Sequence, residues 1–371
     1  MIRSKKSLLC WISIALLLCG VLLYLFLVNP VIKEPFEKRK KKIIGKGKIV
    51  KHTFTRPVFP HPALPLRVHN STWIVKVPLT PFKAPLVLLP QGKPLPSFLL
   101  YKPELLTPVR NQGDCGSCWA FSVCDILSDR LMIQTGAIFD QNISVQQLLA
   151  CFAPDGCDGG SPEDAVMWLA KTQYPLMSSR YMPYTSQDGG FVTTTCPAKL
   201  KGAKIRVEED SVRSIVTFID EVNPDPVLLK QNILNMKRAL MDSGPFYCAV
   251  TVYEDLFTFS GTKVYAHAKG ADQVGGHAIE VIGYADKGVD PRPGFNETGY
   301  WVCRNSWGKD WPTESTTVGY FAIEMGTNMC GIESRCGYAT PLLETSFTPS
   351  ELQQALSLDR LRYTNIKDYL D

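Results

Sequence analysis

The sequence predicts an α+β fold with two lobes. Segments with helical periodicity concentrate before about residue 205, and short apolar runs typical of strands concentrate after it. This segregation favours an α+β arrangement. At 371 residues with 45% hydrophobic content, the chain has ample material for two lobes and appendages.

The net charge of +5 is concentrated at the N-terminus. Residues 1–51 carry a net charge of about +10, which leaves residues 52–371 with about −5. The basic residues therefore form a belt around an apolar N-terminal segment, where they would be attracted to anionic lipid. This distribution does not indicate a nucleic-acid-binding face.

Residues 8–28 predict a transmembrane anchor. They form an uncharged run of 21 residues, after the basic N-terminus at 1–7 and before Asn29-Pro30. That length is sufficient for a helix to cross a bilayer. A cleaved signal peptide is the alternative, but its apolar core is usually shorter. We therefore expect an uncleaved single-pass anchor with the lipid bilayer as a partner.

Two signals for membrane topology conflict. Nine Lys/Arg just after the anchor, against three before it, favour a cytosolic location for the following residues. The twelve cysteines and the glycosylation sequons at Asn70, Asn142 and Asn296 favour the opposite side. We favour the lumenal or extracellular side for the body of the protein.

Residues 29–94 are first basic and then rich in proline, which predicts an extended connector or a propeptide. The globular pattern follows at 95–341, with a helical lobe expected at about 95–205 and a β lobe at about 206–341. A tail at 342–371 ends the chain, and its Thr348-Pro349-Ser350-Glu351 sequence predicts the start of a short helix.

Four helices are predicted from apolar spacing and from start and stop signals. Ser144 is a capping residue, Pro162 opens a helix after a glycine turn, and Gly244-Pro245 stops the last helix. The predicted helices are 118–134, 144–150, 162–171 and 223–243. Short strands are predicted at 246–252, 277–284, 300–304 and 319–324.

Cys118 is the candidate nucleophile because it stands at the start of the first predicted helix. The partial positive charge of a helix N-terminus favours a thiolate over a thiol. Cys115 and Cys118 also form a CxxC sequence, so a membrane thiol oxidoreductase is an alternative.

A thiolate nucleophile needs a base, and the base needs an orienting group. Among five histidines, His277 is the best candidate, because it follows Gly275-Gly276 and opens an apolar strand. Asn305 stands beside Ser306-Trp307, and an asparagine amide oxygen accepts a hydrogen bond from an imidazole and fixes its tautomer. Cys118, His277 and Asn305 therefore make a candidate triad.

At these residues the chain resembles the papain family of cysteine proteases, from about residue 95 to residue 341. The matching motifs are residues 112–122, Cys157-Asp158-Gly159-Gly160, Gly276-His277-Ala278 and Asn305-Ser306-Trp307-Gly308. His277 lies 159 residues after Cys118, which exceeds the spacing of roughly 130 to 150 known in the family. We attribute the excess to an insertion within residues 205–235.

The resemblance implies a two-lobed papain-like fold and hydrolysis of peptide bonds in protein or peptide substrates through an acyl-enzyme, without metal or organic cofactor. Cys118 would attack the carbonyl, His277 would form an ion pair with the Cys118 thiolate and protonate the leaving amine, and Asn305 would orient His277. Gln112 and the backbone N–H of Cys118 would form the oxyanion hole. Trp307 would shield the bond between His277 and Asn305. Gly159 and Gly160 belong to the motif that presents backbone groups to an extended substrate.

The resemblance also implies disulfides between Cys115 and Cys157 and between Cys151 and Cys196. The first of these would prevent redox cycling of the CxxC sequence. Three further cysteines are interpreted as small buried apolar residues: Cys124, Cys248 and Cys303.

Within the family, residues 126–130, 275–279 and 330–334 look most like cathepsin B. No histidine lies between Cys157 and Cys196, so the paired-histidine loop that gives cathepsin B its carboxydipeptidase activity has no counterpart. We therefore expect endopeptidase activity. Residues 29–94 also lack the long helical inhibitory proregion of papain's nearer relatives.

Arg335 occupies the position that resembles the base of the pocket for the second residue before the scissile bond. One hypothesis is a preference there for acidic or polar residues through a charge-assisted hydrogen bond. The other is that Arg335 simply points to solvent, as most arginines do. The remaining alternative for the whole chain is a catalytically silent binding protein on the same fold.

Overall fold

The computed structural model describes seven ranges of the chain, namely 77–87, 94–136, 141–153, 155–189, 195–314, 318–344 and 362–370. Among the described residues, no helix has both the length and the apolar character needed to span a membrane. The predicted anchor at 8–28, the sequon at Asn70 and the predicted capping box at 348–351 lie outside the described residues.

Helices and strands occupy largely separate parts of the described body. The longer helices are α4 (Cys118–Gln134), α5 (Val145–Phe152), α6 (Pro162–Thr172) and α7 (Pro226–Asp242). The main strands of the predicted β lobe are β4 (Phe246–Tyr253), β5 (Gln273–Ala285), β6 (Tyr300–Arg304), β7 (Tyr320–Glu324) and β8 (Cys336–Tyr338). The shorter elements are β1 (Phe98–Tyr101), β2 (Lys204–Val207), β3 (Arg213–Ser214), β9 (Pro341–Glu344), β10 (Arg362–Tyr363) and α9 (Ile366–Leu370).

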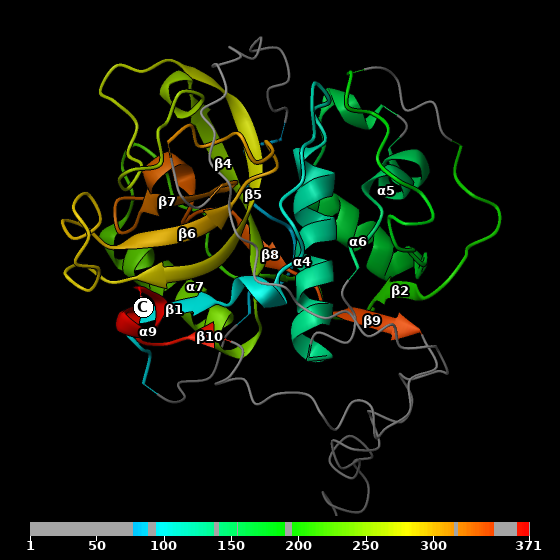
Figure 1. Cartoon of the computed structure of the whole chain (residues 1–371), viewed down its shortest axis with the longest axis horizontal. Helices are drawn as coiled ribbons and strands as arrows, with labels where there is room; N and C mark the ends of the chain where they lie inside the picture. Colours follow the sequence, from blue (N-terminus) through cyan, green and yellow to red (C-terminus); the bar gives the residue numbers. More distant parts are fainter. Residues whose placement is uncertain are drawn as a thin grey trace, which may run out of the picture.

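Eight of the described strands form one sheet, in the order β10-β1-β5-β4-β8-β3, with β6 on β5 and β7 on β6. Figure 1 shows this sheet on one side of α4 and the helices α5 and α6 on the other. The arrangement is the expected α+β architecture in two lobes. The strands β2 and β9 form a separate two-stranded sheet beside the helices.

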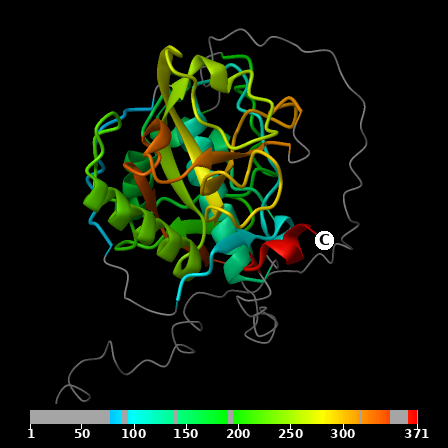
Figure 2. The same ribbon diagram turned by 90° about the vertical axis from the view of Figure 1, so that its left-hand side faces the viewer.

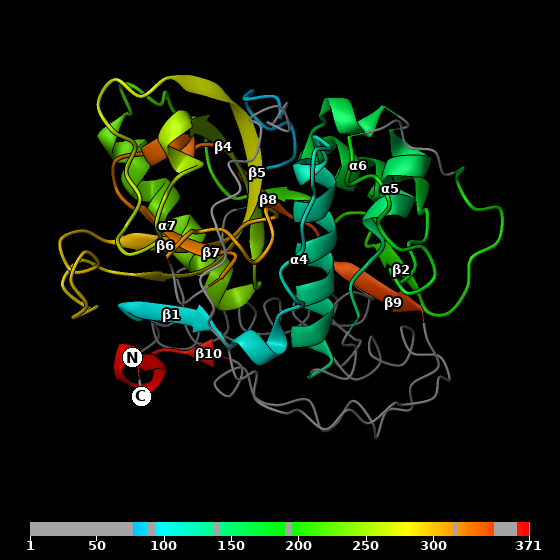
Figure 3. The same ribbon diagram turned by 45° about the horizontal axis from the view of Figure 1, so that its top comes forward.

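Helix α4 is the centre of the molecule. All of its residues from Cys118 to Ile133 are buried, including Asp125, Asp129 and Arg130. The helix packs against β5 on the sheet side and against α5 and α6 on the other, as Figure 3 also shows. A helix enclosed on both sides needs partners for its buried charges, and the sheet supplies them.

The two lobes are not consecutive in the sequence. β1 precedes every helix of the body but belongs to the large sheet, where Leu99 pairs with Tyr284. β9 follows the strands but pairs with β2 beside the helices. The C-terminal residues return to the large sheet, since β10 pairs with β1 and Tyr369 of α9 packs on Phe98, which places α9 beside β1 in Figures 1 and 2.

The predicted helices agree closely with the observed ones, because the capping residues that predicted where they start accept backbone hydrogen bonds there. The side chain of Ser144 accepts a hydrogen bond from Gln147 N at the start of α5. Asp225 accepts two backbone hydrogen bonds at the start of α7. The strand expected at 277–284 is longer than predicted, because β5 begins at Gln273 and pairs with β4 through its glycines.

Candidate active site

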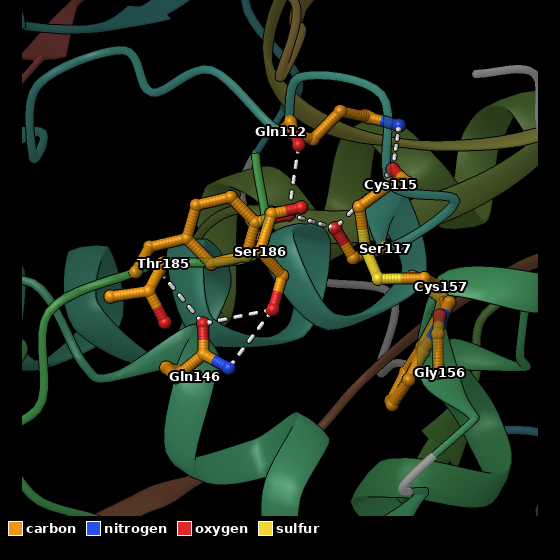
Figure 4. Close-up of a disulfide and its surroundings, with 10 residues drawn as sticks. Gln112, Cys115, Ser117, Gln146, Gly156, Cys157, Thr185 and Ser186 are labelled. Carbon is orange, nitrogen blue, oxygen red and sulfur yellow. Dashed lines mark hydrogen bonds between the residues drawn. A yellow bond between two sulfur atoms is a disulfide. The ribbon is translucent and has the colours of Figure 1, made fainter. Parts of the chain in front are cut away.

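Cys118 is the first residue of α4, and the loop before it is held by a disulfide between Cys115 and Cys157 (Figure 4). Gly116 N donates a hydrogen bond to Cys157 O at 2.9 Å, and a side chain at Gly116 would lie 2.5 Å from that oxygen. The disulfide is the pairing that the resemblance to the papain family implies. Because Cys115 is bonded to Cys157, it does not form a redox pair with Cys118.

His277 and Asn305 meet on the sheet side. His277 lies in β5, and Asn305 follows the last residue of β6. His277 Nε2 is 2.7 Å from Asn305 Oδ1. The other imidazole nitrogen, Nδ1, is buried and makes no hydrogen bond to the part of the chain that the structure describes. The Trp307 ring lies 4.8 Å from the imidazole, between centroids. The His277 imidazole therefore lies against both the Asn305 amide oxygen and the Trp307 ring.

Cys118 and the residue after His277 are in contact across the two lobes, because the backbone of Ala278 hydrogen-bonds the Cys118 sulfur. Both reactive side chains are fully buried. Burial raises the pKa of Cys118 to about 12. Burial also lowers the pKa of His277 to about 4, with a smaller opposing effect of the Asn305 hydrogen bond. Desolvation in this closed arrangement therefore favours the uncharged thiol and the uncharged imidazole, and it outweighs the backbone hydrogen bonds that favour the thiolate.

Gln112 is fully buried beside the Cys118 loop. Its Nε2 donates to Cys115 O at 3.0 Å, and its Oε1 accepts a hydrogen bond from Ser306 Oγ at 2.6 Å (Figure 4 shows the first of these). An amide nitrogen has two N–H donors, so one remains for another acceptor. Ser306 fixes which side of the amide faces the loop, a role that the sequence analysis did not assign.

Gly159 and Gly160 lie on the helical side of the site, between η2 (Gly156–Asp158) and α6. Gly159 has φ of 108°, which favours glycine. A Cβ on Gly160 would be 2.6 Å from the Trp119 ring, whose Nε1 donates to Gly156 O. The Trp119 indole therefore packs against this backbone turn.

Two further disulfides are present. Cys151 pairs with Cys196, as the resemblance implies. Cys248 pairs with Cys336, so the interpretation of Cys248 as an unpaired apolar residue is wrong. The register of β4 and β8 sets these two cysteines directly opposite each other, which no local pattern reveals. The free cysteines of the described ranges are all buried: Cys118, Cys124, Cys303 and Cys330.

Residues 77–87 cross the site between the two lobes, and Figure 3 shows them in blue near β5 and α6. Val77 N donates to Gly276 O at 3.4 Å, directly before His277. Farther along, Ala84 N donates to Glu163 Oε1 of α6 at 2.7 Å. A short parallel bridge also joins the segment to Ser214 of β3. In this bridge Val87 N donates to Ser214 O, and Ser214 N donates back to the segment. This part of the predicted connector is therefore held on both sides of the site.

Arg335 does not point to solvent, because it is only 4% exposed. Its Nη2 lies 3.4 Å from Glu221 Oε2, and its Nη1 donates to Leu79 O at 3.4 Å. Glu221 belongs to the region that we attributed to an insertion, but its role at this site was not foreseen. The two residues are 114 positions apart, so no local motif connects them.

The two described sequons differ in accessibility. Asn296 is exposed, whereas Asn142 is half-buried, and its Oδ1 is buried without a hydrogen-bond partner in the described ranges. Attachment of a glycan is therefore sterically easier at Asn296.

The sequence profile described as "Papain family cysteine protease" matches residues 98–340. The chain belongs to this family. The protease is 31% identical over 246 residues to "Cathepsin B-like cysteine proteinase 5" of Caenorhabditis elegans. The aligned region covers 61% of this chain and 67% of that relative. It is 33% identical to "Cathepsin B-like CP3" of Giardia intestinalis, and the aligned region covers 63% of this chain and 69% of that relative.

A similar solved structure is "proCathepsin B S9 from Trypanosoma congolense". It aligns with a TM-score of 0.53 and 26% identity, covering 70% of this protease and 83% of that chain. The fold comparison therefore agrees with the family assignment.

Proposed function

We propose that the protein is a cysteine endopeptidase that uses Cys118, His277 and Asn305. The hydrogen bond between His277 Nε2 and Asn305 Oδ1 carries this proposal, because it leaves Nδ1 for the Cys118 proton. Cys118 attacks the scissile carbonyl carbon, and its proton passes through His277 to the leaving amine. A water molecule then hydrolyses the thioester and restores the thiol.

Gln112 is the proposed side-chain donor to the oxyanion, together with the backbone N–H of Cys118. The Gln112 amide is preorganised by Cys115 O and Ser306 Oγ, which supports this role. Gly160 and its neighbour Gly159 are proposed to contact the extended substrate, and Trp307 to keep water away from the His277–Asn305 bond.

The absence of histidine between Cys157 and Cys196 in the sequence supports endopeptidase activity. Peptides blocked at both termini distinguish endopeptidase activity from carboxydipeptidase activity. We expect such peptides to be cleaved internally, and release of C-terminal dipeptides alone would contradict the proposal.

Residues 77–87 are proposed to be an inhibitory propeptide segment that leaves the cleft on activation. Their contacts with Gly276 and Glu163 support this role, and so does the likeness to a solved structure whose title names a proform. Leu79→Asp in the full chain should weaken the segment and increase the rate of probe labelling without processing. An unchanged rate would contradict inhibition by this segment.

Labelling of the full chain with an epoxysuccinyl thiol-protease probe tests the nucleophile. Under reducing, mildly acidic conditions we expect labelling of the parent and none of Cys118→Ala. Labelling that persists in Cys118→Ala, or its absence from the parent after processing, would refute the assignment of Cys118.

We further propose that residues 8–28 anchor the enzyme in a membrane, with the catalytic body on the lumenal or extracellular side. The uncharged run of 21 residues supports the anchor, and the disulfides support the side. Carbonate extraction tests the anchor, and glycosidase sensitivity of the Asn296 sequon tests the side.

A further inference from the structure

Arg335 lies beside the reactive strand and not at the protein surface. Thr251 of β4 stands directly opposite Gly276 of β5, one residue before His277. The Arg335 guanidinium lies on this edge of the site, where its Nε donates to Ala249 O of β4 at 3.3 Å. Arg335 thus contacts β4 at Ala249, next to Val250, which pairs with His277.

The charge of Arg335 is already partnered. Glu221 Oε2 lies 3.4 Å from Arg335 Nη2 and accepts a hydrogen bond from Thr251 Oγ1 at 2.6 Å. Its other oxygen accepts a hydrogen bond from Tyr253 Oη at 3.2 Å. The carboxylate is thus held by two strand residues as well as by the arginine, and its side chain is 21% exposed.

The loop that carries Glu221 is fixed against the turn that carries Arg335. Ile219 O accepts a hydrogen bond from Ser334 Oγ, and Asp220 O accepts one from Asn328 Nδ2. Asn232 of α7 bridges the same two segments, because its Nδ2 donates to both Thr217 O and Glu333 O. The position of Glu221 is therefore built into the fold.

Gly331 leaves the space that the ion pair occupies. Its φ is +66°, and a Cβ there would collide with Arg335 Nη2 and lie 2.9 Å from Glu221 Oε2. A glycine at this point allows the two charged groups to approach each other directly.

We infer that Glu221 is a specificity-determining residue, which cancels the charge of Arg335 so that the pocket selects uncharged aliphatic side chains over acidic ones. This inference rests on the proposed endopeptidase function. The observed neighbour is consistent with it: Leu79 O accepts from Arg335, and the Leu79 side chain lies against Gly276, within 3.1 Å of where a Cβ would stand. An acidic side chain at this place would meet the Glu221 carboxylate and be repelled.

The test compares Glu221→Gln with the parent in the full chain, after processing and titration of active sites with the epoxysuccinyl probe. Substrates are matched peptides with leucine, glutamine or glutamate as the second residue before the scissile bond. The parent should cleave the leucine peptide best. Glu221→Gln leaves Arg335 uncompensated, so the ratio of kcat/KM for glutamate over glutamine should rise about tenfold, as for a hydrogen bond to a charged group.

Two further variants make the result specific. Glu221→Gln combined with Arg335→Gln should lose the acquired preference for glutamate, because the cation is gone. Glu209→Gln removes one exposed carboxylate elsewhere and should leave all ratios unchanged.

Failure of this inference is distinguishable from failure of the proposed function. If the parent cleaves none of the peptides and binds no probe, the endopeptidase proposal itself fails. If the parent is active but already prefers glutamate, or if Glu221→Gln leaves the ratios unchanged with full active-site titration, the role of Glu221 is refuted.

Discussion

The carboxylate of Glu280 in β5 lies 2.5 Å from the guanidinium of Arg304 in β6, and both side chains are almost completely buried. Arg304 directly precedes the catalytic candidate Asn305. The same guanidinium lies 3.0 Å from Asp129 of α4, and it donates to Thr107 O at 2.6 Å. One arginine thus joins the central helix to the strand that positions Asn305.

Replacing Arg304 should destabilise the protein strongly. Arg304→Gln leaves the buried carboxylates of Asp129 and Glu280 without their main counter-charge. Because breaking a buried ion pair costs about 3 to 5 kcal/mol, the free energy of unfolding should fall by about that amount. Chemical denaturation of the full chain measures the loss.

Arg206→Gln is the matched control for this variant. It removes an arginine from a partly exposed pair with Glu344, whose side chain is 47% exposed. This change should cost less than about 1 kcal/mol. Equal losses in the two variants would show that the buried cluster has no special role.

The reactivity of Cys118 should depend on pH in a defined way while residues 77–87 remain in place. Burial raises its pKa to about 12, so the thiolate fraction is very small near neutrality and grows as pH rises toward that value. The rate of alkylation by iodoacetamide, corrected with Cys118→Ala, should therefore increase continuously through the alkaline range. A plateau already reached at neutral pH in the unprocessed chain would contradict this expectation.

Variants of Gln112 and Ser306 should distinguish donation of a hydrogen bond to the oxyanion from positioning of the donor. Gln112→Ala removes the proposed oxyanion donor and should lower kcat by about 10² to 10³. Ser306→Ala leaves the amide but removes the hydroxyl that orients it, so we expect a smaller fall in kcat with little change in KM. Thr262→Ala, at an exposed hydroxyl, is the control. An equal fall in kcat and unfolding midpoint for Ser306→Ala and Gln112→Ala would favour a structural role alone.

The disulfides should be reduced in the order of their exposure, because thiol exchange requires access of the attacking thiolate. Cys196 is exposed, whereas Cys248 and Cys336 are both fully buried. Under increasing concentrations of reductant, mass spectrometry of alkylated peptides should detect Cys196 first and Cys248 last. Simultaneous appearance of both would indicate global unfolding before reduction.

Local signals predicted the helical parts of this protein well. The start of α4 at Cys118 and the caps of α5 and α7 follow from residues within one or two turns of each boundary. The motifs around His277 and Asn305 also identified residues that the structure places within hydrogen-bond distance.

Contacts between distant segments could not be predicted in this way. The pairing of Cys248 with Cys336 depends on the register of β4 and β8, and the partner of Arg335 comes from a loop 114 residues away. The position of residues 77–87 across the site depends on both lobes at once. Periodicity reports which face of an element is buried but not which element covers it.

The sequence by itself determined the two-lobed α+β fold through periodicity, and it determined the family and the candidate triad through short motifs, each made of residues close together in the chain. Only the tertiary structure decided how deeply the reactive side chains are buried and which group compensates the charge of Arg335. The assembled lobes bury Cys118 and His277 completely, which disfavours their charged forms, and Arg335 is compensated because the fold brings Glu221 to it. Both outcomes depend on burial and on distances between segments far apart in the sequence.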